Sequence, residues 1–119
     1  MRKSIERFLI EHDCPLEYMG FSILVEAIAC SAKYVGDIKS NLKSIYIEVG
    51  GKFNISRLCI ERNLRTLMAA WAGTEKFCQL FEDVPTNAKL IISLTHKCFD
   101  TPKPERIKSR ASVYDILFS

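Results

Sequence analysis

The chain has 119 residues, enough for one domain with a hydrophobic core that needs neither disulfides nor a metal. Hydrophobic residues make up 48% and charged residues 26% of it, values ordinary for a soluble globular protein, and the formal net charge is a modest +3. No apolar run approaches the roughly 20 residues that a membrane span requires, and charges inside the first apolar segment exclude a secretory signal.

Helical periodicity dominates the sequence, and no stretch alternates apolar and polar residues for long enough to predict a strand. A first helix is expected from a cap at Ser4 to about His12, because apolar residues recur there at three- and four-residue spacing. A second helix is expected over 21–34, ended by Gly36. It is rich in aliphatic residues and should be the most buried element.

A third helix is expected to start near residue 40 and reach about Lys52. Ser56 is then the expected N-cap of a fourth helix over 57–71. These two helices and the turn between them form a predicted helix-turn-helix over about 40–71.

The fourth helix is expected to stop at Gly73, and two shorter helices follow over 75–81 and 87–99. Residues 1–100 are therefore predicted to be one all-α domain, a bundle of about six helices. Residues 101–119 begin with a basic, proline-containing stretch and are predicted to be a C-terminal tail.

The helix-turn-helix prediction depends on residue types at fixed spacing, counted from Tyr46. The small residue where the two helices nearly touch is Gly50, and the turn residue four places later is Asn54, which tolerates left-handed backbone. Asn63 stands where another apolar residue is usual, and Leu64 is expected to replace it. The apolar supporting residues are Val49, Phe53, Ile55 and Ile60. The pattern is typical of a module that lays its second helix in the major groove of DNA.

The predicted helix over 57–71 has two faces of different character. Its buried stripe should consist of Ile60, Leu64, Leu67, Met68 and Trp71. On the opposite face we expect Glu61, Arg62 and Arg65 to read base edges, because arginine can bond guanine with both arms and glutamate can accept from cytosine. The alternative is that Glu61 and Arg65 only form an ion pair within the helix, worth about 0.3–0.5 kcal/mol.

The basic excess lies on the same segment, where residues 52–65 carry a net charge of +3 and the tail carries +2. Such a distribution suits a DNA contact surface, although a solvated helix face beside a basic tail would give the same charges. Ser56 and the free N–H groups at the helix start could also meet a phosphate. The candidate phosphate-contacting residues are Lys39, Lys43, Lys52, Ser56 and Arg57.

The sequence predicts no enzyme, metal, cofactor or small-molecule substrate. His12 and His96 are far apart, and neither has a ligand set with metal-site spacing. No glycine-rich phosphate loop or nucleophile elbow is present. The five cysteines include no C-x-x-C pair and are interpreted as buried, reduced packing thiols of a cytosolic protein.

From about residue 10 to residue 99 the chain resembles the C-terminal DNA-binding effector domain of the stage zero sporulation response regulator of spore-forming bacteria. The order and spacing of the matching pieces hold nearly without gaps to Arg65, and a few residues are missing before Pro85. The matching pieces are Pro15, Gly20-Phe21, Glu26-Ala27-Ile28, Lys52-Phe53-Asn54, Ile60-Glu61-Arg62 with Arg65, Ala70-Trp71, Leu80-Phe81 and Pro85-Thr86-Asn87.

The resemblance implies a six-helix bundle with an embedded helix-turn-helix. It implies that Glu61, Arg62 and Arg65 read a TGTCGAA-type box in double-stranded DNA. It also implies a homodimer on DNA, with residues near 80–94 serving self-association.

The chain departs from that family in three places. It begins at Met1 without a receiver domain, so control is expected from elsewhere. Its recognition helix starts with Ser56-Arg57-Leu58-Cys59, where the family carries small polar residues and an arginine, and the tail lies outside the resemblance.

The preferred hypothesis is a sequence-specific transcriptional regulator related to sporulation control, located in the bacterial cytoplasm. One alternative is an interaction protein that has lost DNA binding and pairs with a sporulation regulator or another partner. Another alternative is nonspecific DNA binding, in which the basic tail makes most of the contacts with DNA.

Overall fold

The computed structural model describes residues 1–99, in which every regular element is a helix. The predicted all-α class with six helices is therefore confirmed, whereas the predicted tail lies outside the described residues. The α-helices are α1 (Arg2–Glu11), α2 (Met19–Ser31), α3 (Leu42–Phe53), α4 (Arg57–Trp71), α5 (Glu75–Leu80) and α6 (Asn87–Phe99). The 3-10 helices are η1 (Ala32–Tyr34) and η2 (Lys39–Asn41).

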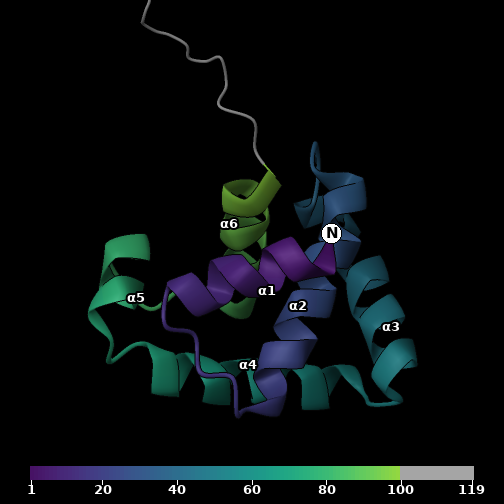
Figure 1. Ribbon diagram of the computed structural model, residues 1–119. Helices are drawn as coiled ribbons and strands as arrows, with labels where there is room; N and C mark the ends of the chain where they lie inside the picture. Colours follow the sequence, from purple (N-terminus) through teal and green to yellow (C-terminus); the bar gives the residue numbers. More distant parts are fainter. Residues whose placement is uncertain (100–119) are drawn as a thin grey trace, which may run out of the picture.

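Helix α2 is the centre of the fold, because α1, α3, α4 and α6 all pack against it. Nearly all of its residues are buried, as its aliphatic composition predicts. Figure 1 shows α4 along the lower edge of the fold, with α3 at one end and α5 at the other. Among residues 1–99, no other helix lies beneath the outer side of α4 in this view.

The start of α1 differs from the prediction, because the helix begins at Arg2 and Ser4 does not cap it. The Ser4 hydroxyl donates to the Met1 carbonyl oxygen at 2.8 Å and so does not accept from a free N–H group. Helix α2 also begins earlier than expected, at Met19, and its predicted last turn is the 3-10 helix η1.

The start of α4 agrees with the prediction, because the Ser56 hydroxyl accepts from the Cys59 N–H at 3.2 Å. At the other end, Trp71 is fully buried, and its indole N–H donates to the carbonyl oxygen of His12 at 2.8 Å. Helix α4 is thus held at its C-terminal end by the segment that follows α1.

The five cysteines are free thiols in different surroundings. Burial raises the pKa of both Cys14 and Cys30 to about 12 and that of Cys98 to about 11, so these three stay protonated at neutral pH. Cys59 is half-buried and Cys78 is exposed, so the interpretation as buried packing thiols does not hold for Cys78.

Within residues 1–99, no single helix is long and apolar enough to cross a membrane. Residues 19–34 taken together with 39–53 pass that test by length and composition only, as a pair bent by 115°. The apolar character of this pair comes mainly from α2, which is buried by its neighbours.

Candidate nucleic-acid interface

The turn between α3 and α4 has the geometry that the residue pattern predicts. A Cβ atom on Gly50 would lie 2.7 Å from the carbonyl oxygen of Ile55, so only glycine allows this close approach. Asn54 ends α3 in the left-handed conformation, with φ 57° and ψ 49°. The Ile55 N–H then donates to the Gly50 carbonyl oxygen at 3.0 Å, which closes the turn.

The inner face of α4 consists of the predicted stripe, since Ile60, Leu64, Leu67, Met68 and Trp71 are its buried residues. Leu64 is fully buried and takes the apolar place, as expected. Asn63 instead donates from its side chain to the Cys59 carbonyl oxygen at 2.8 Å. A Cβ atom on Gly20 would lie 2.5 Å from the backbone carbonyl oxygen of Asn63. Because Gly20 has no Cβ, α4 can pack tightly against α2 at this point.

The outer face of α4 presents the three predicted base-reading residues. Arg62 and Arg65 are exposed, and the Glu61 side chain is 28% exposed. Their spacing of three and four residues brings them onto adjoining turns of one face. Within the part of the chain that the structure describes, neither guanidinium group takes part in an ion pair.

Glu61 has a different ion-pair partner from the one considered in the sequence. Its carboxylate accepts from the Arg57 Nε at 3.1 Å, and it is not paired with Arg65. The Arg57 guanidinium also lies over the Tyr46 ring, 4.3 Å from its centroid. Tyr46 on α3 and Arg57 therefore orient Glu61, which leaves Arg65 available for another partner.

A groove of about 610 Å³ lies between α3 and the start of α4. Three of the five predicted phosphate-contacting residues, Lys43, Ser56 and Arg57, line it. The other lining residues are Tyr46, Ile47, Gly50, Gly51, Asn54 and Ile55. Sequence reasoning missed Tyr46 and Ile47 as part of this surface, although they follow Lys43 at three and four residues and so share its helix face.

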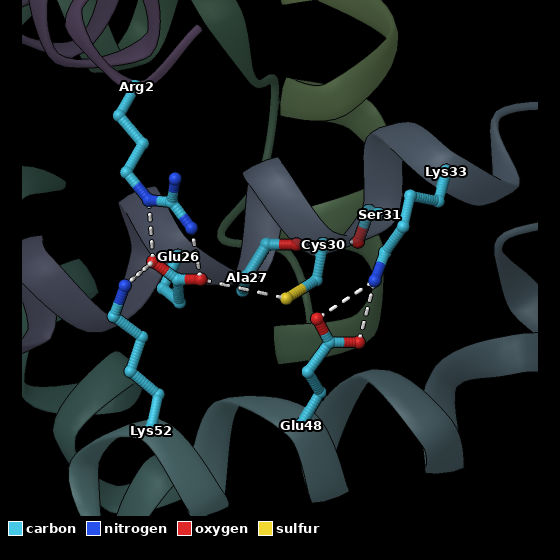
Figure 2. A network of polar contacts seen from close by, with 8 residues as sticks. All are labelled: Arg2, Glu26, Ala27, Cys30, Ser31, Lys33, Glu48 and Lys52. Atoms are coloured by element: carbon cyan, nitrogen blue, oxygen red, sulfur yellow. Dashed lines mark hydrogen bonds and ion pairs between the residues drawn. The ribbon is translucent and has the colours of Figure 1, made fainter.

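The remaining two predicted phosphate-contacting residues, Lys39 and Lys52, do not line this groove. Lys39 is exposed in η2. The Lys52 ammonium lies 3.3 Å from a carboxylate oxygen of Glu26, on the α2 side of α3 (Figure 2). Lys52 follows Lys43 by nine positions, which is two and a half helical turns, so the two side chains leave α3 on opposite sides.

Glu26 is only 6% exposed and holds two cations from other helices. Arg2 on α1 donates to both of its carboxylate oxygens, at 2.8 Å and 2.6 Å, and Lys52 on α3 lies opposite (Figure 2). The hydrogen bonds from Arg2 keep the pKa of Glu26 below its ordinary value, with a further lowering by Lys52. The sequence signal for this cluster was a single carboxylate inside an otherwise apolar helix.

A second groove, of about 510 Å³, lies between α4 and the segment before α6. Arg65 lines it, and Asn87 donates from its side chain to the Glu61 carbonyl oxygen at 3.1 Å. The groove is lined by Arg65, Met68, Ala69, Val84, Pro85, Thr86 and Asn87. The first residue of α6 thus supports the backbone of α4. Among residues 1–99, no group of three or more histidine, cysteine or carboxylate side chains could hold a metal ion.

Comparison with protein families gives one match, to the C-terminal domain of the sporulation initiation factor Spo0A, over residues 5–98. No match was found among the curated proteins or the solved structures that were compared. The matched stretch covers α2 to α5 completely and all but the ends of α1 and α6, with the helix-turn-helix inside it. The chain therefore belongs to the family of the C-terminal, DNA-binding domain of the sporulation initiation factor Spo0A.

Proposed function

We propose that this protein is a sequence-specific transcriptional regulator related to sporulation control, which reads double-stranded DNA by laying α4 in the major groove. The family is one of DNA-binding regulators of sporulation. The observation that carries the proposal for this chain is the outer face of α4, where Arg62 and Arg65 are exposed and Glu61 is oriented by Arg57.

Base reading is assigned to Glu61, Arg62 and Arg65. Each arginine can donate two hydrogen bonds to guanine O6 and N7, and the glutamate can accept from the amino group of cytosine. A face with both signs of charge suits base edges, whereas a purely positive face would only hold phosphates.

Phosphate binding is assigned to the groove between α3 and α4. Lys43, Arg57 and the N–H groups behind Ser56 border it, and the N-terminal end of a helix favours an anion. Lys39 and Lys52 remain predicted phosphate contacts outside this groove, and Lys52 would have to leave Glu26 to reach DNA. The proposal extends to a homodimer on DNA in the bacterial cytoplasm, which the family resemblance implies.

The test is binding of the purified protein to a labelled duplex carrying a TGTCGAA-type box and to a scrambled duplex, across a salt series. A preference for the box that survives physiological salt supports specific regulation. Equal binding that disappears as salt rises would indicate charge alone.

Arg62→Ala and Arg65→Ala are each expected to cost about 1–3 kcal/mol on the best site and to relax base choice there. The measurement is the dissociation constant on the box and on single-base variants of it. Both substitutions lie on the exposed face, so thermal unfolding should be unchanged. Site preference that survives both substitutions would show that the base-reading face is assigned wrongly.

A second candidate function is an interaction protein that pairs with another regulator. Val84 favours it, because this large apolar side chain is 62% exposed at the edge of the second groove. Failure of the protein to bind either duplex would move the assignment to this candidate.

A further inference from the structure

Leu58 is an exposed apolar residue in the first turn of the recognition helix. It is 59% exposed, whereas Ile60, two residues later, is fully buried. Leaving a leucine in water forgoes the stabilisation that its burial would give, so this side chain contributes little to the folded core.

Leu58 shares its helix face with the base-reading residues. It precedes Glu61 by three residues, Arg62 by four and Arg65 by seven, which brings all four side chains onto one side of α4. Leu58 is the member nearest the N-terminus, and the N-terminal residues of a recognition helix are the ones that contact base edges.

The backbone around Leu58 is held in place before any partner binds. The Ser56 hydroxyl accepts from the Cys59 N–H at 3.2 Å and fixes the first turn. The adjacent Arg57 is drawn over Tyr46 and toward Glu61. The exposed leucine therefore stands on an ordered turn.

We propose that Leu58 is a specificity-determining residue that contacts the 5-methyl group of a thymine in the major groove. This inference rests on the proposed function. The three charged residues on the face can recognise only donors and acceptors, whereas the thymine methyl is the one apolar group that a base pair offers in this groove. An apolar side chain beside them adds the missing kind of contact, and it favours thymine over cytosine at one position.

The test begins with duplexes selected by the wild-type protein from a random pool. Each thymine of the selected site is then replaced singly by deoxyuridine, which lacks only the 5-methyl group. At one position we expect the wild-type affinity to fall about three- to tenfold, the size expected for one buried methyl group. Leu58→Ala should show a similar loss on the thymine duplex and no further loss on the deoxyuridine duplex.

Two further variants make the result specific. Leu58→Met keeps an apolar side chain of similar volume and should retain most of the methyl dependence. Leu16→Ala removes a leucine of similar exposure, 57%, from the segment between α1 and α2 and should bind like the wild type.

The outcomes separate this inference from the proposed function. A selected site whose recognition is insensitive to every deoxyuridine, or equally sensitive in wild type and Leu58→Ala, overturns the role of Leu58 alone. Failure to select any sequence overturns the proposed function and the inference with it. A Leu58→Ala protein that keeps its methyl dependence but changes its oligomeric state in light scattering would assign Leu58 to a protein contact instead.

Discussion

Gly50 and Gly51 are neighbours in α3, but only Gly50 is required by the turn. A Cβ on Gly50 would meet the Ile55 carbonyl oxygen at 2.7 Å, whereas a Cβ on Gly51 would meet nothing within 4 Å. The obstacle at Gly50 is backbone, which cannot move aside without shifting the start of α4. Gly50 therefore sets how closely the two helices of the motif approach.

We expect Gly50→Ala to destabilise the protein by about 1–3 kcal/mol, the usual cost of forcing an extra carbon into a packed site. Gly51→Ala is the matched control and should stabilise by about 0.5–1 kcal/mol, because alanine favours a helix over glycine. Urea unfolding of both variants measures the difference. Equal changes in the free energy of unfolding at the two positions would mean that the Ile55 carbonyl oxygen leaves room for a Cβ atom at position 50.

The ion pair of Glu61 shows what spacing alone leaves undecided. Arg57 and Arg65 both stand four residues from Glu61, so the sequence permits either pair. Tyr46, which comes from a different helix, favours Arg57 because the guanidinium also lies over its ring. The alternative that Glu61 pairs with Arg65 is therefore correct in predicting an ion pair within α4 but wrong about the arginine, which is Arg57.

At the scale of elements, α3 carries basic residues on two sides with different surroundings. Lys43 borders the groove beside the start of α4, and Lys52 pairs with Glu26 on α2. The sequence predicts the same role for both lysines, because both flank the proposed groove-facing surface. Their separation follows from the direction of each side chain around α3.

Lys43→Ala is therefore expected to weaken binding to all DNA sequences alike and to reduce the salt slope by about one. Lys52→Ala should change DNA affinity less and should lower the free energy of unfolding instead, because Glu26 loses one of its two cations. Salt-dependent binding isotherms and urea unfolding on both variants distinguish the two roles. A loss of affinity for Lys52→Ala as large as for Lys43→Ala would show that Lys52 contacts phosphate despite its ion pair with Glu26.

The helices whose ends agree with prediction are those with local signals. Ser56 caps α4, as the sequence predicts, and the expected limits of α4 and α6 agree with the structure. Ser4 is of the same residue type, but its hydroxyl donates to the Met1 carbonyl oxygen. A serine near a helix start can take either role, and the sequence does not decide between them.

At the scale of the whole molecule, the cluster around Glu26 joins three helices through one nearly buried carboxylate. Arg2 lies 24 residues away from it in sequence, and Lys52 comes from α3 (Figure 2). No spacing rule relates these three positions. Their meeting depends on how α1 and α3 pack on α2, which is why sequence reasoning identified the fold but not this cluster.

The lowered pKa of Glu26 predicts how stability depends on pH. The folded state favours the ionised form of Glu26, so this carboxylate stabilises the fold. Its contribution to the free energy of unfolding is fully present above the unfolded pKa of about 4.3, and it is lost as pH falls through the lower folded pKa. Glu26→Gln should be less stable than wild type at neutral pH. The free energies of unfolding of the two proteins, measured with urea across a pH series, should converge in acid.

Glu48 provides the control for this pH experiment. Its pKa is also lowered, by the hydrogen bond from Lys33, but its side chain is 47% exposed. Solvent screens such a pair, so Glu48→Gln should change the pH dependence little. If Glu48→Gln removed as much acid sensitivity as Glu26→Gln, the assignment of that sensitivity to the buried carboxylate would be wrong.

Trp71 is the sole tryptophan in the sequence, and its position makes it a built-in optical probe. The indole is fully buried and packs edge-on against Phe77 with ring centroids 5.0 Å apart. Its N–H donates a hydrogen bond to the His12 carbonyl oxygen in the segment after α1. Its emission should therefore shift to longer wavelength when α1 separates from α4. The proposed base-reading face lies on the other side of the same helix, so titration with DNA should leave that emission nearly unchanged. One unlabelled sample can thus report loss of the fold separately from occupancy of the groove-facing side.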